Sequence, residues 1–149
     1  MSASAVIAVE LTHAVVTVFM TAVIWFVQVV HYPLFARVGP SAFQAYEAAH
    51  VRRITWIVMP AMLLELVSAT AIVLLGSAHW SPAAACAGLG LLVLIWASTG
   101  LVQVPLHRHL EKGLDDTVVA RLVKSNWIRT AAWTARAGLV VLALATALR

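Results

Sequence analysis

Hydrogen-bonding and charged side chains recur inside the most apolar parts of this chain, where such groups are rare. The last apolar segment opens with four of them at steps of three and four: Asn126, Arg129, Trp133 and Arg136. On a helix this spacing places all four on one face. An arginine carried into hydrocarbon is costly and normally faces protein, water or a bound partner. We therefore expect Arg129 and Arg136 to hold or polarise a developing oxyanion, with Asn126 orienting it.

Two earlier apolar segments carry polar faces of the same kind. The first presents His13, Thr17, Thr21, Gln28 and His31, and the third presents Trp96, Thr99, Gln103 and His107. Only the interior of a helix bundle can receive three such faces at once. There we expect a substrate to be bound by Gln28, Gln103, Asn126, Trp96 and Trp133. His31 or His107 would move its proton.

An acidic residue, Glu65, lies in the second apolar segment, five residues after Pro60. At about 1.5 Å per residue, Glu65 lies about 16 Å from the start of its segment and Arg136 about 14 Å from the start of its own. The two segments run in the same direction, so these charges reach similar depth. Two interpretations stay open: a buried ion pair that fixes helix register, or a catalytic pair in which one member meets substrate or carries protons.

Composition assigns the chain to the membrane proteins. Of its 149 residues, 62% are hydrophobic and 11% charged, and the mean hydropathy is +0.94. A soluble domain of this size could not bury so much apolar surface. The isoelectric point near 10.0 does not indicate nucleic-acid binding, because the basic residues flank apolar segments instead of forming a separate face. The single cysteine, Cys86, excludes an internal disulfide.

The predicted fold is all-α: a single membrane domain, residues 1–149, formed by a four-helix bundle. The candidate spans are residues 6–35, 54–76, 83–105 and 127–148, each long enough to cross hydrocarbon. Lys and Arg gather at the first and third loops and the adjoining helix ends, whereas only Arg149 lies on the other side. The positive-inside rule then predicts that loops one and three are cytoplasmic and both termini non-cytoplasmic, in a membrane of the bacterial cytoplasmic type.

Both cytoplasmic loops are expected to contain a short interfacial helix. Ser41 with Gln44 has the pattern of a capping box that starts the first. Asp115, Asp116 and Thr117 begin the second, which is expected to lie along the membrane surface before the chain turns inward.

Four histidines fall near the cytoplasmic ends of the spans: His31, His50, His107 and His109. Converging imidazoles would allow haem ligation if the bundle brought two of them together. The alternative is that each hydrogen-bonds a neighbour or reaches toward the membrane surface. A bound quinone is the other cofactor we consider.

Several short motifs resemble those of the anthrone oxygenase-like family of small four-helix membrane proteins. They are Gln28 and Pro33 at the end of the first span, Pro105-Leu106 with Leu110 after the third, and Asn126-Trp127-Ile128-Arg129-Thr130 at the start of the fourth. His107 stands where the family pattern has an asparagine. Some fungal members are associated with oxidising anthrones to anthraquinones, so the resemblance implies an oxidation of aromatic compounds.

The leading hypothesis is a membrane-embedded oxidoreductase, or oxygenase-like protein, acting on a hydrophobic aromatic or quinone-like molecule within the bundle. One alternative is a non-enzymatic membrane subunit or carrier, and another is a haem-binding electron-transfer protein. The expected partners are membrane lipid and a hydrophobic small molecule, but no nucleic acid. Small residues at four-residue spacing, Ala84 with Gly88 and Cys86 with Gly90, also favour a homo-oligomer.

Overall fold

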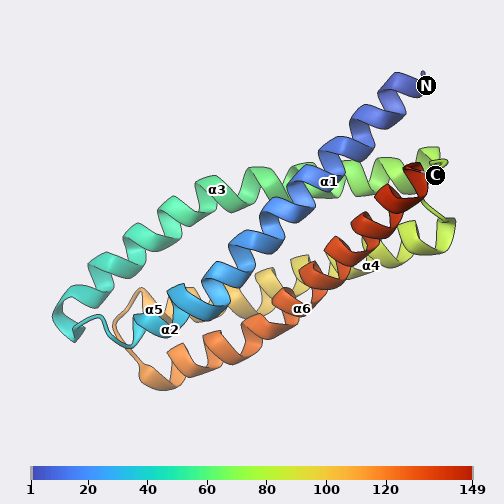
Figure 1. Ribbon diagram of the computed structural model, residues 1–149. Coiled ribbons are helices and arrows are strands. Elements are labelled where there is room, and N and C mark those ends of the chain that lie inside the picture. The colour runs from blue at the N-terminus through green and yellow to red at the C-terminus, as the bar shows by residue number, and fades with distance from the viewer. Residues whose placement is uncertain (1, 149) are drawn as a thin grey trace.

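The computed structural model describes residues 2–148, which form four long helical rods and no strands (Figure 1). The first rod joins α1 (Ala3–Phe26), η1 (Val27–His31) and α2 (Tyr32–Phe35), and the second is α3 (Pro40–Leu75). The third joins α4 (Pro82–Ser98), η2 (Thr99–Gln103) and α5 (Val104–Leu110), and the fourth is α6 (Asp116–Ala147). Here η denotes a π-helix.

Successive rods run in opposite directions, so the chain consists of two hairpins side by side. Figure 1 shows both termini and the α3–α4 connection at one end, and the α2–α3 and α5–α6 connections at the other. The second end is called the basic end below, because Arg37, Arg108 and Lys112 flank its connections. The side of the membrane that it faces stays a prediction, and Arg149 lies outside the described residues.

Each rod is long and apolar enough to span a membrane, which confirms the predicted fold class and a membrane protein. The outward surface agrees with this, since large apolar side chains such as Trp56 and Leu101 are almost fully exposed. An apolar surface this extensive is stable in hydrocarbon but not in water. The largest apolar core lies between the rods in the half toward the basic end and includes Phe35, Phe43 and Trp133.

The expected interfacial helices are not separate elements, and in this respect the sequence prediction was wrong. α3 begins at Pro40 after an N-cap at Gly39, so Ser41 caps nothing. α6 begins at Asp116, and the Asp115 carboxylate accepts hydrogen bonds from the backbone N–H groups of the next turn. Both helices then continue without a break into the bundle. Each therefore brings polar residues of its first turns into contact with the other rods.

Two π-helical turns occupy matching places in the two hairpins. In η1 the backbone N–H of Tyr32 bonds to the carbonyl of Val27, and in η2 that of Val104 bonds to the carbonyl of Thr99. A proline follows each turn at the next position but one, Pro33 and Pro105. Proline lacks an N–H and its ring clashes with the carbonyl four residues earlier, so a widened turn relieves the conflict. Such π-bulges are frequent at functional sites.

Candidate functional site

Three side chains from three rods form a hydrogen-bonded row inside the basic half of the bundle, called the Tyr32 triad below. The Tyr32 hydroxyl lies 2.9 Å from His107 Nε2, and His107 Nδ1 lies 2.5 Å from Glu47 Oε1. Arg129 Nη2 donates to the Tyr32 oxygen across 3.4 Å. Because an ionised carboxylate only accepts hydrogen bonds, the His107 Nδ1 proton is donated to Glu47. Nε2 of a neutral His107 then accepts from the Tyr32 O–H.

The local structure explains how each member of the triad reaches this place. Tyr32 follows the η1 turn directly, and His107 lies one turn into α5, just beyond η2. Each bulge rotates the residues that follow it relative to their positions in a regular helix, so the side chains of Tyr32 and His107 turn inward. Glu47 comes from the first turns of α3, which pack inside the bundle. Tyr32 and Glu47 are buried, and a buried carboxylate requires a partner such as His107.

A second row of polar side chains holds Arg129. The side-chain oxygen of Asn126 accepts from Arg129 Nε at 2.9 Å and from Nη2 at 2.5 Å. The Asn126 amide in turn donates to Gln28 Oε1 at 2.9 Å, and Arg129 Nη1 donates to Thr99 Oγ1 at 3.3 Å. Asn126 and Gln28 therefore orient the guanidinium from behind, whereas their expected role was direct contact with substrate.

Tyr32, His107 and Arg129 border an interior cavity of about 380 Å³, and Glu47 lies behind His107. Most of its wall is apolar and includes Met20, Ile24, Val58, Met62 and Trp133. Its polar groups are Tyr32, Thr99, Gln103, His107 and Arg129, together with Thr55, Arg108 and Glu111, which line it between α3 and α5. The Gln103 amide nitrogen donates to Ser125 Oγ at 3.0 Å, but its buried oxygen has no hydrogen-bond partner. An apolar space with a few converging polar groups is the usual form of a small-molecule site.

The predicted site residues divide between this cavity and its surroundings. His107, Arg129, Gln103 and Trp133 line it. Residues of the same prediction that do not are Gln28, His31, Glu65, Trp96, Asn126 and Arg136. Trp96 lies on α4 with its buried indole N–H unpartnered, away from the cavity wall.

Glu65 and Arg136 form the expected ion pair in the middle of the bundle. Arg136 Nη2 lies 3.1 Å from Glu65 Oε1, and both side chains are almost fully buried. The same carboxylate accepts from Thr17 at 3.0 Å and from the Trp133 indole at 2.9 Å, and Arg136 also donates to the carbonyl of Gly88. This central pair does not line the cavity, and Arg136 Nη2 makes no hydrogen bond beyond its ion contact with Glu65.

The remaining histidines bond to neighbours. His31 Nε2 lies 2.7 Å from His50 Nδ1, and His13 Nδ1 lies 3.0 Å from the Ser68 hydroxyl. His109 and His107 have different partners, with His109 Nε2 3.5 Å from an Asp115 carboxylate oxygen. The described residues contain no group of three or more His, Cys, Asp or Glu side chains arranged to hold a metal ion.

No family model, curated protein or solved structure matches the chain. The resemblance to the anthrone oxygenase-like family therefore stays a prediction. What the protein does has to be inferred from the geometry of the cavity and its polar wall.

The sequence analysis missed two members of the triad, Tyr32 and Glu47. Tyr32 lies within the first predicted span, residues 6–35, and Glu47 lies between the first and second predicted spans, so neither stood out as a polar residue inside an apolar segment. One signal was present: Val30-His31-Tyr32-Pro33-Leu34 parallels Val102-Gln103-Val104-Pro105-Leu106. A shared proline after a polar residue in two membrane spans indicates paired distortions of those helices, and Tyr32 is next to one of them.

Proposed function

We propose that the protein is a membrane-embedded oxidoreductase of the oxygenase-like kind, acting on a hydrophobic aromatic or quinone-like molecule in the interior cavity. The cavity volume of about 380 Å³ suits a molecule of a few fused rings. Apolar walls would hold the rings, and the polar groups near the basic end would meet a ring oxygen. The observation that carries the proposal is the Tyr32 triad opening onto this cavity beside Arg129.

The triad supports proton removal from such a substrate. Tyr32 would accept a proton from an acidic C–H or O–H of the substrate while passing its own to His107, and Glu47 would stabilise the resulting imidazolium. The negative charge left on the substrate would gather on its ring oxygen. Arg129, held in place by Asn126, is a donor already oriented toward that charge.

Dioxygen is the oxidant that this proposal names. The substrate carbanion would give its electron pair to dioxygen, forming a C–O bond and a peroxide anion, which takes up the proton returned through Tyr32. Loss of water would then convert the original methylene into a carbonyl. One dioxygen molecule is consumed and one water released per turnover.

The test compares removal of the Tyr32 hydroxyl with an aromatic substitution on the outer surface. Oxygen uptake would be recorded for protein in lipid nanodiscs supplied with anthrone. We expect Tyr32→Phe to lower kcat by about 100-fold or more, the range for loss of a general acid–base group. Trp56→Phe serves as the control, because Trp56 is exposed on α3 and does not line the interior cavity, and it should retain wild-type activity. Equal activity in the two variants would contradict the proposal.

A carrier or membrane subunit that performs no reaction is the second candidate. The central pair favours it, since the Glu65 carboxylate is hydrogen-bonded by Thr17, Trp133 and Arg136 without any ligand. A carrier would bind anthrone in the wild-type protein and in Tyr32→Phe with the same affinity and would consume no oxygen. Binding measured alongside oxygen uptake therefore separates the two candidates.

A further inference from the structure

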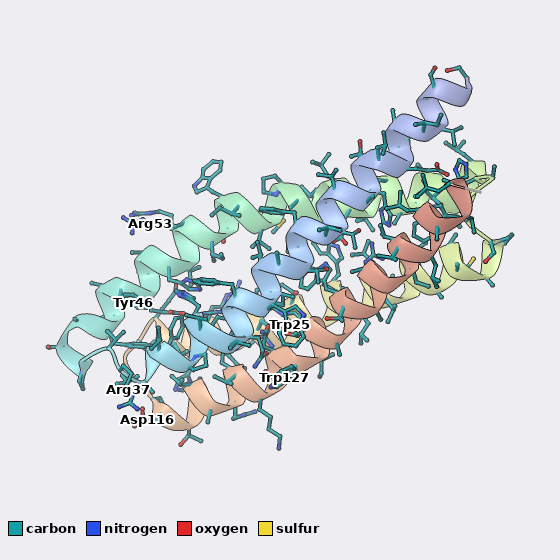
Figure 2. All side chains as sticks on the ribbon, in the orientation of Figure 1. Trp25, Arg37, Tyr46, Arg53, Asp116 and Trp127 are labelled. Atoms are coloured by element: carbon teal, nitrogen blue, oxygen red, sulfur yellow. The ribbon has the colours of Figure 1, made fainter. Side chains whose placement is uncertain are left out.

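A second space lies on the outside of the bundle, in the groove between α1 and α3 near the basic end. Its volume is about 530 Å³. The residues that line it are Phe19, Ala22, Val23, Phe26, Val27, His31, Tyr46, Ala49, His50, Arg53, Ile54 and Ile57. Phe26 is 58% exposed, so the groove opens onto the surface that faces hydrocarbon. In Figure 2, Tyr46 lies on the side of α3 toward α2, whereas Arg53 extends away from the bundle.

The groove and the interior cavity have a common wall. Val23 and Val27 of the first rod and Ile54 of α3 line both spaces. At these positions the two spaces are separated only by aliphatic side chains. Such side chains change rotamer without breaking a hydrogen bond, so this wall opens at a lower cost than one built from paired polar groups.

In both spaces the polar side chains lie toward the basic end of the bundle. His31 and Tyr32 are consecutive in sequence, yet His31 lines the groove and Tyr32 lines the cavity. His50 and Arg53 of α3 line the groove on the side opposite His31. No Asp or Glu lines the groove. A ring molecule with an electron-rich oxygen would therefore lie in both spaces with that oxygen toward the basic end.

We propose that the groove is a second binding site, a vestibule on the lipid side, for the same hydrophobic, oxygen-bearing ring molecules, which reach the cavity by passing between Val23, Val27 and Ile54. The other route leads between α3 and α5, past Thr55, Arg108 and Glu111. Along that route an apolar molecule dissolved in the bilayer would have to displace water from charged side chains. This inference rests on the proposed function, because it takes its ligand class from the cavity.

The experiment follows the quenching of tryptophan fluorescence by 2-methyl-1,4-naphthoquinone after rapid mixing with protein in nanodiscs. Trp133 lines the cavity but not the groove, so subtracting the signal of Trp133→Phe isolates arrival in the cavity. In the wild-type protein the observed rate should saturate with quinone concentration, because the groove fills before transfer inward. Ala22→Phe fills the groove and should slow arrival at least fivefold while leaving the final Kd unchanged.

The matched control is Ala131→Phe, an exposed alanine on α6 that lines neither space. It should behave as the wild-type protein. If Ala22→Phe lowers the yield of folded protein, Ala49→Phe fills the same groove from α3. Unchanged rates in the folded groove variants, with slowing by Thr55→Phe instead, would overturn the vestibule and assign access to the α3–α5 side. Absence of Trp133 quenching in the wild-type protein at every quinone concentration would overturn the proposed function together with the vestibule.

Discussion

Two buried clusters, each containing a carboxylate, lie in this bundle, and they differ in what surrounds them. In the central pair, the Glu65 carboxylate accepts from Thr17, Trp133 and Arg136 and borders no cavity. In the Tyr32 triad, Glu47 bonds to His107 through one oxygen, while its other oxygen is buried without a hydrogen-bond partner. Burial of a charged group therefore does not by itself distinguish a cluster that stabilises the fold from one suited to proton transfer. Each cluster also has one buried polar atom without a hydrogen bond, Arg136 Nη2 and Glu47 Oε2, so what distinguishes the triad is its place beside a cavity.

The backbone differs between the two clusters as well. Glu65 and Arg136 lie on the uninterrupted helices α3 and α6, whereas Tyr32 follows η1 and His107 follows η2. Trp133 touches both regions, since its indole donates to Glu65 and its ring lines the cavity. The central pair therefore holds Trp133, which forms part of the cavity wall. The π turns orient Tyr32 and His107 toward the polar side of the cavity.

The largest effect is expected from breaking the central pair. Glu65→Leu leaves Arg136 buried without its counter-charge and should lower the free energy of unfolding by about 3–5 kcal/mol. The double variant with Arg136→Leu should recover much of this loss, because no uncompensated charge remains. Unfolding of detergent-solubilised protein by sodium dodecyl sulfate measures both. Equal destabilisation by the single and double variants would show that the pair does more than satisfy its own charges.

The opposite pattern is expected for the triad. Glu47→Gln keeps the volume but removes the charge that stabilises a protonated His107, so oxygen uptake with anthrone should fall by about 10²-fold. Its unfolding free energy should change much less than that of Glu65→Leu. If Glu47→Gln instead unfolds the protein without a specific loss of kcat, the two clusters have the same structural role.

An effect of intermediate size is expected from removing the proline that follows a π turn. Pro105→Ala restores an N–H at the second position after η2 and removes the ring that conflicts with the preceding turn. We expect the helix to become more regular and His107 to rotate away from Glu47, lowering activity about tenfold with little loss of stability. Ala97→Ser, on the exposed face of α4 before the bulge, is a control for substitutions in this rod. Full activity of Pro105→Ala would mean that tertiary packing alone maintains the π turn.

The smallest effect is expected next to the central pair. Ser68→Ala removes the hydrogen bond to His13, and interhelical bonds of this kind contribute about 0.6 kcal/mol on average in membrane proteins. Oxygen uptake should be unchanged, because Ser68 lines no part of the interior cavity. A marked fall in kcat would place this region in the catalytic path and remove the distinction between the clusters.

The long-range pattern of the fold was accessible from sequence, because helical periodicity and rise are nearly constant in a membrane. These two quantities predicted the spans and placed Glu65 opposite Arg136. They did not predict the triad, since the π turns change the angular position of every later residue on the same rod. This shift brings Tyr32 to the cavity and leaves His31 in the outer groove. Side-chain pairing was equally hidden, so Asn126 and Gln28 were assigned to substrate although they hold Arg129.

The matching positions of η1 and η2 are the arrangement expected if both hairpins descend from one ancestral hairpin. Both hairpins run from the end that carries the termini to the basic end and back (Figure 1). The first rod of each hairpin contains a π turn followed by a proline. Duplication and fusion of one ancestral hairpin would produce this arrangement, with both copies inserted in the same orientation. At the matching positions the two halves differ: His31 and Tyr32 in one correspond to Gln103 and Val104 in the other. A symmetric ancestor would have been a dimer of hairpins, with its reactive groups present twice.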